Sequence, residues 1–311
     1  MSIRVVTDST ADLPPELAKE MDITIVPAYV GFGRETFRDG IEISQDEVYR
    51  RMVEENIPAT TSQAPPADFA EVFKKLLKDD DEIVSIQATS KLSGLYNSAL
   101  QGKDIAEGGN RIAVVDSLST SMGLGMMTLV AARMAQAGES LSCIVEELRQ
   151  TVQQTRLWGM FDTLKYLFNG GRLGKAKSLL GGMLPVKALL TMRDGEIHPM
   201  GMARTRSRGI DRLFELFKNS PNVEEVAVVH STTPEEAQSL KERISAMFDR
   251  GPVHISRLGP ALGVHGGPGT MVLALREKVN NLKQEIKESE VARKTISLPS
   301  LRRPRFHFSR L

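Results

Sequence analysis

Short runs of apolar, β-branched residues alternate with longer helix-like segments along the first half of the chain. In this pattern each apolar run is a buried strand, and each longer segment is a helix that returns the chain across the sheet. We therefore predict a mostly parallel sheet with helices on both faces. The strands are predicted at 3–6, 23–26, 83–87 and 112–115, and the helices at 14–21, 44–54, 66–77, 93–107 and 119–137.

The second half of the chain changes in character after a predicted helix at 141–155. Arg193-Asp194-Gly195 separates two strand-like runs there, and Asp-Gly is typical of tight hairpin turns because it tolerates positive φ. The segment therefore predicts a hairpin within a second α/β unit. The predicted elements are 157–161, 162–168, 186–192, 196–203, 210–218, 226–229, 234–248, 253–257 and 271–275, with a Gly-rich basic loop at 169–175.

We place a domain boundary near Gln154, where this change occurs. The fold class is then α/β, with two α/β domains at 1–154 and 155–280, of which the first is a Rossmann-like, mostly parallel sheet. Whether residues 66–78 pack on the second domain is left open. Residues 281–311 form a separate extension with eight basic residues against three acidic ones. We expect it to be a short helix and a mobile tail, or else a transient contact with an acidic partner or an anionic membrane surface.

Ser and Thr residues cluster close to Gly after several of these strands. Ligands of open α/β sheets bind at the carboxyl ends of strands, so these hydroxyls are well placed to meet a ligand. Short hydroxyls and open backbone amides suit a small anionic or polar head group. The clusters lie at 7–10, 60–63, 89–94 and 117–123.

The composition is that of an ordinary globular protein. Of 311 residues, 41% are hydrophobic and 25% are charged, and a formal net charge of +1 gives no global field that would select nucleic acid or a membrane. The single Cys143 fits a reducing compartment. The first strand follows Met1 too closely for a signal peptide, and the longest apolar stretch, 122–132, is too short to span a bilayer. We expect a cytoplasmic protein that does not bind nucleic acid.

The sequence lacks the common catalytic and cofactor motifs. Gly174-Lys175 has neither the earlier Gly nor the following hydroxyl of a nucleotide-binding P-loop, and Gly123-Leu124-Gly125 lacks the third Gly of a dinucleotide fingerprint. The sequence contains no Gly-x-Ser-x-Gly, and its five His residues have no metal-ligand spacing. We therefore predict no catalytic residue, no metal site and no cofactor.

Two residues in Gly-rich segments are candidates for a ligand site. His265 lies within 259–269, where glycines let a ligand approach the backbone closely, and Arg172 follows Gly170-Gly171. Their alternatives are a packed structural histidine and a solvated loop charge. Three hydroxyls have helix N-caps as their alternative role: Thr61, Ser62 and Ser93.

Five motifs, in order, resemble those of the DegV family. Together they extend from about Ile3 to Leu275 and leave only the basic extension uncovered. Each motif is weak alone, but five in order are specific. They are Thr7-Asp8-Ser9-Thr10-Ala11-Asp12-Leu13, Thr61-Ser62-Gln63, Ser90-Lys91-Leu92-Ser93-Gly94, Leu164-Lys165-Tyr166-Leu167 with Gly170-Gly171-Arg172-Leu173, and Gly259-Pro260 with Gly263, His265 and Gly267-Pro268-Gly269.

The resemblance implies two α/β domains with a long-chain fatty acid, such as palmitate, bound between them. It also implies a bacterial role, in which the protein buries the acyl chain and presents the carboxylate to a separate fatty-acid kinase. The kinase makes acyl phosphate, which the binding protein carries toward phospholipid synthesis. By this resemblance the chain is a carrier without catalytic activity of its own.

Carried over by position, the resemblance implies a head-group site to which both domains contribute. Thr61, together with Ser62, and Ser93 would hydrogen-bond the carboxylate. The Gly94 amide would lie close by, and His265 would complete the site from the second domain.

Two arginines are implied to face outward, and three positions depart from the family pattern. Arg172 and Arg204 would face the kinase or the phosphorylated head group. The departures leave the proposed head-group ligands in place and bear on the acyl tunnel instead. They are Leu95 where Thr is usual after Ser-Gly, Ala188 where Pro is usual after Lys187, and Ala64-Pro65 in place of Pro-Ser after Thr-Ser-Gln.

Two other classes of function stay open at this point. The fold also resembles the substrate domains of dihydroxyacetone kinases, in which a His bonds covalently to the substrate, so that His265 would be a nucleophile. The sequence offers no evident base to activate it. The remaining class is an adaptor that works through protein contacts alone. Fatty acid extracted from the purified protein would favour the carrier.

Overall fold

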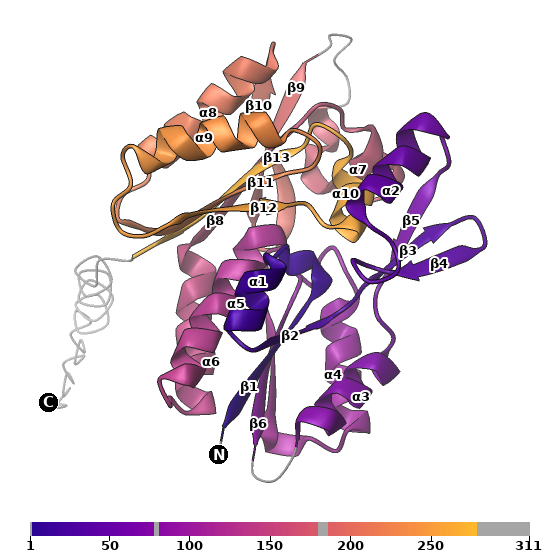
Figure 1. The fold of residues 1–311 in the computed structure, drawn as a ribbon, viewed down its shortest axis with the longest axis vertical. Helices are drawn as coiled ribbons and strands as arrows, with labels where there is room; N and C mark the ends of the chain where they lie inside the picture. The colour runs from indigo at the N-terminus through magenta and orange to yellow at the C-terminus, as the bar shows by residue number, and fades with distance from the viewer. Residues whose placement is uncertain (1, 78–80, 180–185, 279–311) are drawn as a thin grey trace, which may run out of the picture. The chain divides into compact units, whose positions relative to one another are not determined.

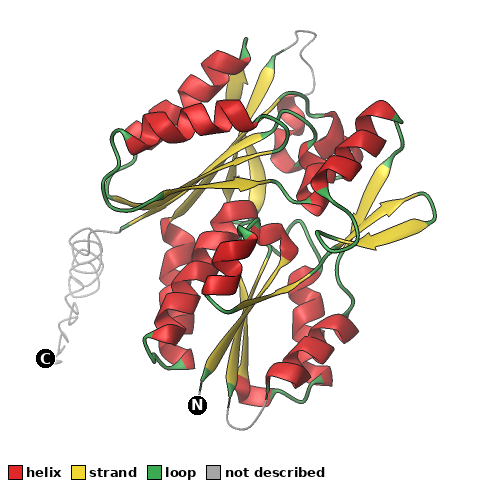
Figure 2. Ribbon diagram, in the orientation of Figure 1, coloured by secondary structure: helices red, strands yellow, loops and turns green. Residues whose placement is uncertain are grey.

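The structure is a computed structural model that describes residues 2–77, 81–179 and 186–278. The basic extension 281–311 lies outside these residues. The chain through Glu277 forms one compact unit, and its described strands pair into three sheets (Figures 1 and 2).

The first half of the chain is built on a four-stranded sheet in the order β2-β1-β6-β7, and all of its strands are parallel, as predicted. Helices α5 and α6 pack on one face and α3 and α4 on the other (Figure 1). The two central strands are buried on both faces, which is why they are nearly continuous apolar runs. The elements are β1 Ile3–Asp8, α1 Pro15–Glu20, β2 Ile23–Val26, α3 Pro66–Leu76, β6 Glu82–Gln87, α4 Leu95–Ile105, β7 Ile112–Asp116, α5 Ser121–Gln136 and α6 Leu141–Gln154.

Helix α3 bears on the open question about residues 66–78. It packs mainly against α4, and it also contacts β2. Both partners belong to the first half of the chain, so the described part of this segment lies with the first sheet.

A small antiparallel sheet in the order β4-β3-β5 adjoins the first half and was not predicted. Its strands are β3 (Tyr29–Phe32), β4 (Glu35–Arg38) and β5 (Ala59–Ser62). Helix α2 (Gln45–Tyr49), continued by a π-helical turn over Arg50–Glu54, connects β4 to β5. This sheet carries Thr61, so the hydroxyl cluster at 60–63 lies on a strand.

The second half is built on a six-stranded mixed sheet in the order β10-β9-β8-β13-β11-β12, in which only β11 and β12 are parallel. Asp194 and Gly195, with φ of 50° and 79°, form the predicted turn of the β9–β10 hairpin. Helices α8 and α9 cover the outer face (Figure 1). The elements are β8 Thr155–Phe161, α7 Lys165–Asn169, β9 Lys187–Arg193, β10 Glu196–Ala203, α8 Arg206–Lys218, β11 Val223–His230, α9 Pro234–Ser245, β12 Val253–Arg257, α10 Pro260–Gly266 and β13 Met271–Glu277.

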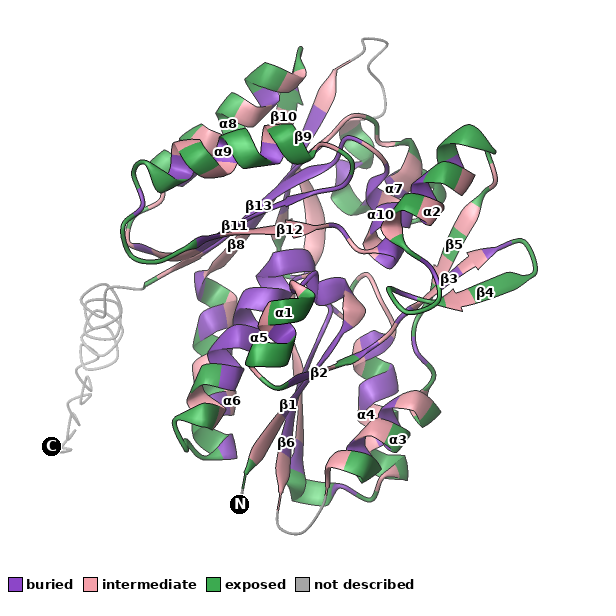
Figure 3. Cartoon of the chain, in the orientation of Figure 1, coloured by how far each residue is buried: buried purple, intermediate pink, exposed green. Residues whose placement is uncertain are grey.

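Helix α5 lies between the two large sheets and is buried almost all round (Figure 3). It contacts β1 and β6 of the first sheet and β8, β11 and β13 of the second. A helix that is buried on every side is apolar on every side, which accounts for the apolar stretch 122–132. None of the described helices is long and apolar enough to cross a membrane.

Candidate functional site

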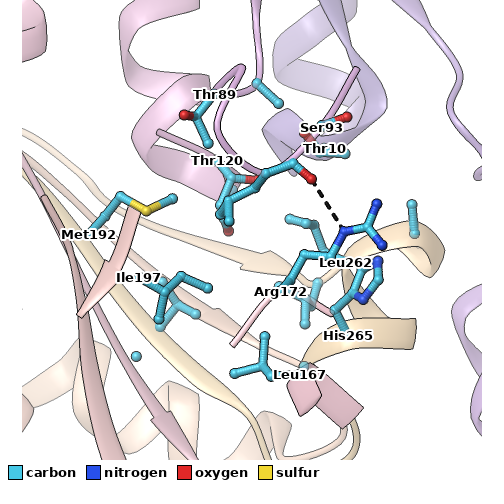
Figure 4. Close-up of a pocket in the computed structure, with 18 of the residues that line it drawn as sticks. Thr10, Thr89, Ser93, Thr120, Leu167, Arg172, Met192, Ile197, Leu262 and His265 are labelled. Carbon is cyan, nitrogen blue, oxygen red and sulfur yellow. Dashed lines mark hydrogen bonds between the residues drawn. The ribbon is translucent and has the colours of Figure 1, made fainter. Parts of the chain in front are cut away.

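A cavity lies where the first half of the chain faces the inner side of the second sheet (Figure 4). Its volume is about 150 Å³, counted as the space that the centre of a water molecule can occupy. That is roughly ten times the space that one water needs on this measure, so the cavity has room for a larger guest. Its apolar lining includes Leu157, Phe161, Leu190, Met192 and Ile197 from β8, β9 and β10, and Leu95, Leu258, Leu262 and Val272.

Polar groups gather at one end of this cavity, and they come from both halves of the chain. Thr61 and Ser62 lie on β5, Ser93 lies just before α4, and His265 lies on α10; all four line the cavity. Thr61 Oγ1 and His265 Nε2 are 2.7 Å apart, although the two residues are far apart in sequence. The structure therefore brings together four of the predicted head-group residues.

The His265 ring is neutral in this site. Burial, and secondarily the positive charge of Arg172, lower its pKa to about 4. Nδ1 is buried without a hydrogen-bond partner among the described residues, and it lies so close to Gly170 that a Cβ there would be 2.1 Å away. Because an unpaired buried N–H is costlier than an unpaired acceptor, the proton belongs on Nε2. His265 then donates to Thr61 Oγ1, which leaves the Thr61 hydroxyl proton available to a guest.

Ser93 adds a further hydroxyl at the start of α4. Its Oγ accepts a hydrogen bond from the Leu95 N–H, at 3.3 Å, and it also lines the cavity. The N-cap residue of α4 is Gly94, and the helix has no side-chain cap. Thr61 and Ser62 are not caps, because they lie on a strand and α3 begins after Pro65 without a side-chain cap. The N-cap interpretation is thus wrong for all three residues, although Ser93 does bond to the first backbone N–H of α4.

Gly94 stands beside the cavity and not in its lining. A Cβ at this position would lie 2.9 Å from the Gln63 side chain, so Gln63 packs directly over the Gly94 backbone. Gln63 itself lines the cavity. Sequence reasoning included it in a motif but did not single it out, although its amide adds a donor at this end of the cavity.

Arg172 lines the cavity and connects the two halves of the chain. Its Nε donates to the Leu92 carbonyl at 3.2 Å, the contact dashed in Figure 4, and its Nη1 donates to the Gly170 carbonyl at 2.6 Å. It is half-buried, so it is more than a solvated loop charge. Arg204 differs, because it is exposed at the end of β10 and does not line the cavity.

A cluster of buried carboxyls at the start of α10 was missed by sequence reasoning. Asp12 accepts hydrogen bonds from Gly259 N–H, at 2.8 Å, and from the Ser121 hydroxyl. Asp39 accepts from Ser9 Oγ, at 2.7 Å, and from the backbone N–H of Ala261. Burial raises the pKa of Asp12 to about 8 and that of Asp39 to about 6. These contacts hold α10, and hence His265, against the first half.

The polar end of the cavity is suited to bind an anion. It presents hydroxyls and an amide that can donate hydrogen bonds, and the His265 N–H orients the Thr61 hydroxyl so that its proton is free for a guest. Within residues 2–77, 81–179 and 186–278, no three His, Cys, Asp or Glu side chains are placed to share a metal ion. The remaining walls are mostly apolar, with Thr residues such as Thr89, Thr120 and Thr191 among them, so the cavity suits a molecule with a small polar head and a long apolar body.

Comparisons with known proteins agree with this geometry. Residues 2–278 match the sequence profile of a family described as "Uncharacterised protein, DegV family". A DegV domain-containing protein of Caldanaerobacter subterraneus is 36% identical over 279 residues, which cover 89% of this chain and 99% of that protein.

Two solved structures have the same fold as this chain. A DegV family protein from Thermus thermophilus, described as binding fatty acid, superposes with a TM-score of 0.83 at 30% identity, over 89% of this chain and all of the other. DegV from Bacillus subtilis, described as a fatty acid binding protein, has a TM-score of 0.81 at 32% identity over the same shares. The two-domain α/β fold class predicted from the sequence is thus confirmed.

Proposed function

The chain belongs to the DegV family, and we propose that it binds a long-chain fatty acid in the cavity between its two halves. The observation that carries the proposal is the Thr61–His265 pair, with Ser93 beside it in the lining of a largely apolar cavity. The carboxylate lies at this end, and the acyl chain follows the apolar wall. Fatty-acid binding by the Thermus and Bacillus relatives supports the same ligand class.

Burial of the acyl chain supplies most of the binding free energy. At about 0.8 kcal/mol per methylene, a long chain contributes on the order of 10 kcal/mol before the costs of association. The carboxylate contributes selectivity, because a buried charge without donors is strongly disfavoured. Hydroxyl and amide donors meet this need without adding a fixed charge to the site.

We propose further that the protein presents the bound carboxylate to a separate kinase, which forms the acyl phosphate. The head-group residues support this step, because the same donors can hold either a carboxylate or a phosphate. Arg172 lies beside them, half-buried and bound to two carbonyls. A guanidinium in that position can pair with the added phosphate, which prefers the planar fork of arginine.

The geometry does not favour the alternative in which His265 is a covalent nucleophile. A nucleophilic imidazole must present its unprotonated nitrogen to the substrate. In His265 that nitrogen is Nδ1, which is buried against Gly170, whereas Nε2 carries the proton and meets Thr61. The ring is therefore held as a neutral donor to Thr61, which is a binding role.

Mass spectrometry of an organic extract tests the ligand class directly. Protein purified from a bacterial host is expected to release long-chain fatty acid in close to equal amounts with the protein. Protein that carries no fatty acid, and that also fails to bind added palmitate in calorimetry, would refute the proposed function. ATP turnover by the purified chain without a partner would refute the non-catalytic role.

A further inference from the structure

Acyl-chain length is the next property to assign, and one side chain at the far end of the cavity bears on it. We propose that Met192 is the stop against which the end of the acyl chain packs, so that it sets the longest chain that the cavity holds. This inference rests on the proposed binding of fatty acid.

The position of Met192 in the hairpin makes it the end of the apolar wall. Met192 pairs with Ile197 across β9 and β10, and both side chains line the cavity. The next two residues along the chain, Arg193 and Asp194, line a second hollow instead. The wall thus changes from apolar to charged directly after Met192.

The second hollow lies immediately behind this wall. Leu157, Thr191 and Met192 line both hollows, so a single layer of residues separates them. The second hollow is more polar than the cavity, because Ser117, Gln153, Arg156, Arg193 and Asp194 line it together with the apolar Leu118, Met127, Val152 and Trp158. An acyl chain that passed Met192 would exchange a mostly apolar wall for a half-polar one, and a chain that ends before it would leave a gap in packing.

The residues proposed to bind the head group lie at the end of the cavity opposite Met192. In Figure 4, His265 and Arg172 are on one side of the view and Met192 is on the other, with Ile197 between them. A carboxylate held by Thr61 and His265 therefore directs the acyl chain along the wall toward Met192. The span between the two ends is the length available to the acyl chain.

The backbone that carries Met192 is held in place, which leaves its side chain as the adjustable part. Thr89 Oγ1 donates to the Gly195 carbonyl at 3.0 Å, so the hairpin turn is tied to the first half of the chain. A Cβ at Gly195 would lie 2.4 Å from the same Thr89 oxygen, which shows how closely the turn sits. A methionine side chain is unbranched and flexible, so it can pack against chain ends of slightly different position.

The role of Met192 as the stop can be tested by calorimetry. Saturated fatty acids of increasing length are titrated into the full-length protein after bound lipid has been removed. For the wild type we expect the affinity to rise roughly fourfold per methylene until the chain end reaches Met192, and to level off beyond it. Met192→Ala should move this break to chains longer by roughly two methylenes, because alanine lacks the outer atoms of the side chain. Met192→Phe should move it to shorter chains. Met202→Ala is the matched control, since Met202 lies on the same hairpin and is 54% exposed.

The outcomes separate this inference from the function on which it rests. Opposite shifts of the break in Met192→Ala and Met192→Phe, with Met202→Ala unchanged, would support the stop; a general folding defect would not move the break in two directions. A break at the same chain length in the wild type and both variants would overturn it while leaving fatty-acid binding intact. A wild type that binds none of the acids would refute the proposed function and the stop together.

Discussion

Helix α10 meets the first half of the chain at two polar joints that are built from different groups. At its start, the carboxyls of Asp12 and Asp39 accept hydrogen bonds from backbone N–H groups of the helix. At its last turn, His265 meets the Thr61 hydroxyl. The first joint is rich in acceptors and is buried, whereas the second is rich in donors and opens into the cavity.

The first joint positions helix α10, and the second is the one that a ligand can reach. The carboxyls at the first joint are engaged by groups of the protein itself, and an anionic guest would gain nothing from them. At the second joint, hydroxyl protons are free to bind a guest. This joint keeps its position against the first half of the chain because the other end of the same short helix is fixed. Buried acids can thus fix the position of an anion-binding site without adding their own negative charge to it.

The largest effect is expected from removing the Asp12 carboxyl. Asp12→Ala leaves the Gly259 N–H and the Ser121 hydroxyl buried without a partner, and it places alanine at a φ of 51°. We expect a loss of roughly 3–5 kcal/mol in the free energy of unfolding. Denaturant titration measures this loss.

Asp22→Ala is the matched control for that variant. Asp22 has the same φ of 51°, but its side chain is 70% exposed, so the substitution adds backbone strain without orphaning buried donors. We expect a loss of at most about 1–2 kcal/mol from it. Equal losses in the two variants would mean that backbone conformation, and not the buried joint, accounts for the effect.

Next in size is the pH dependence that comes from His265. Its pKa is lowered to about 4, so between pH 6.5 and pH 4 the unfolded chain takes up a proton at this residue and the folded chain does not. Folding is therefore destabilised as the pH falls through this window, by an amount that approaches about 3 kcal/mol. His265→Gln does not titrate, so its stability should decline less than that of the wild type between pH 7 and pH 4.5. Parallel declines in the two proteins would contradict the assignment of a buried neutral ring.

A smaller effect, confined to binding, is expected at the second joint. Ser93→Ala should weaken fatty-acid binding by about tenfold or more, because a hydrogen bond to a charged group contributes roughly 1.5–3 kcal/mol. Ser90→Ala is the control from the same loop, since Ser90 does not line the cavity. Isothermal calorimetry gives both affinities. An unchanged affinity for Ser93→Ala would remove Ser93 from the head-group site.

The smallest effect on binding is expected from Arg172→Ala. The guanidinium is half-buried and bound to protein carbonyls, so fatty-acid affinity should change by less than about 1 kcal/mol. The rate of acyl phosphate formation by the partner kinase should fall, whereas the exposed Lys218→Ala should leave it unchanged. Weakened binding together with unchanged turnover at saturating ligand would reverse this assignment.

The elements that sequence predicts well are those with a local pattern. The central strands β1 and β6 of the first sheet are buried on both faces and are therefore short apolar runs, and Asp194-Gly195 tolerates the positive φ that a tight hairpin turn needs. Residues from all four hydroxyl clusters line the cavity. Three of the clusters follow strands of the first sheet, whose carboxyl ends meet at one edge, whereas the cluster at 60–63 lies on β5.

The elements that sequence misses depend on contacts between distant segments. Strand β5 is a polar stretch that becomes a strand by pairing with β3. Its sequence lacks the alternation of apolar and polar residues that would predict a strand. No helix was predicted in the Gly-rich segment 259–269, because glycine disfavours helices, yet packing and the acids at its start make Pro260–Gly266 helix α10. The role of Asp12 was not foreseen, because nothing local indicates that its carboxyl faces Gly259.

The central claim is that Thr61 and His265 hold a carboxylate at the mouth of an acyl cavity, and one calorimetric comparison tests it most directly. A fatty acid and the fatty alcohol of equal length are titrated into the wild type and into Thr61→Val, which keeps the shape of threonine and removes its hydroxyl. We predict that the wild type prefers the acid, and that Thr61→Val loses about tenfold or more in affinity for the acid while its affinity for the alcohol changes little. Equal affinities for acid and alcohol in the wild type, or an unaltered affinity for the acid in Thr61→Val, would contradict the account.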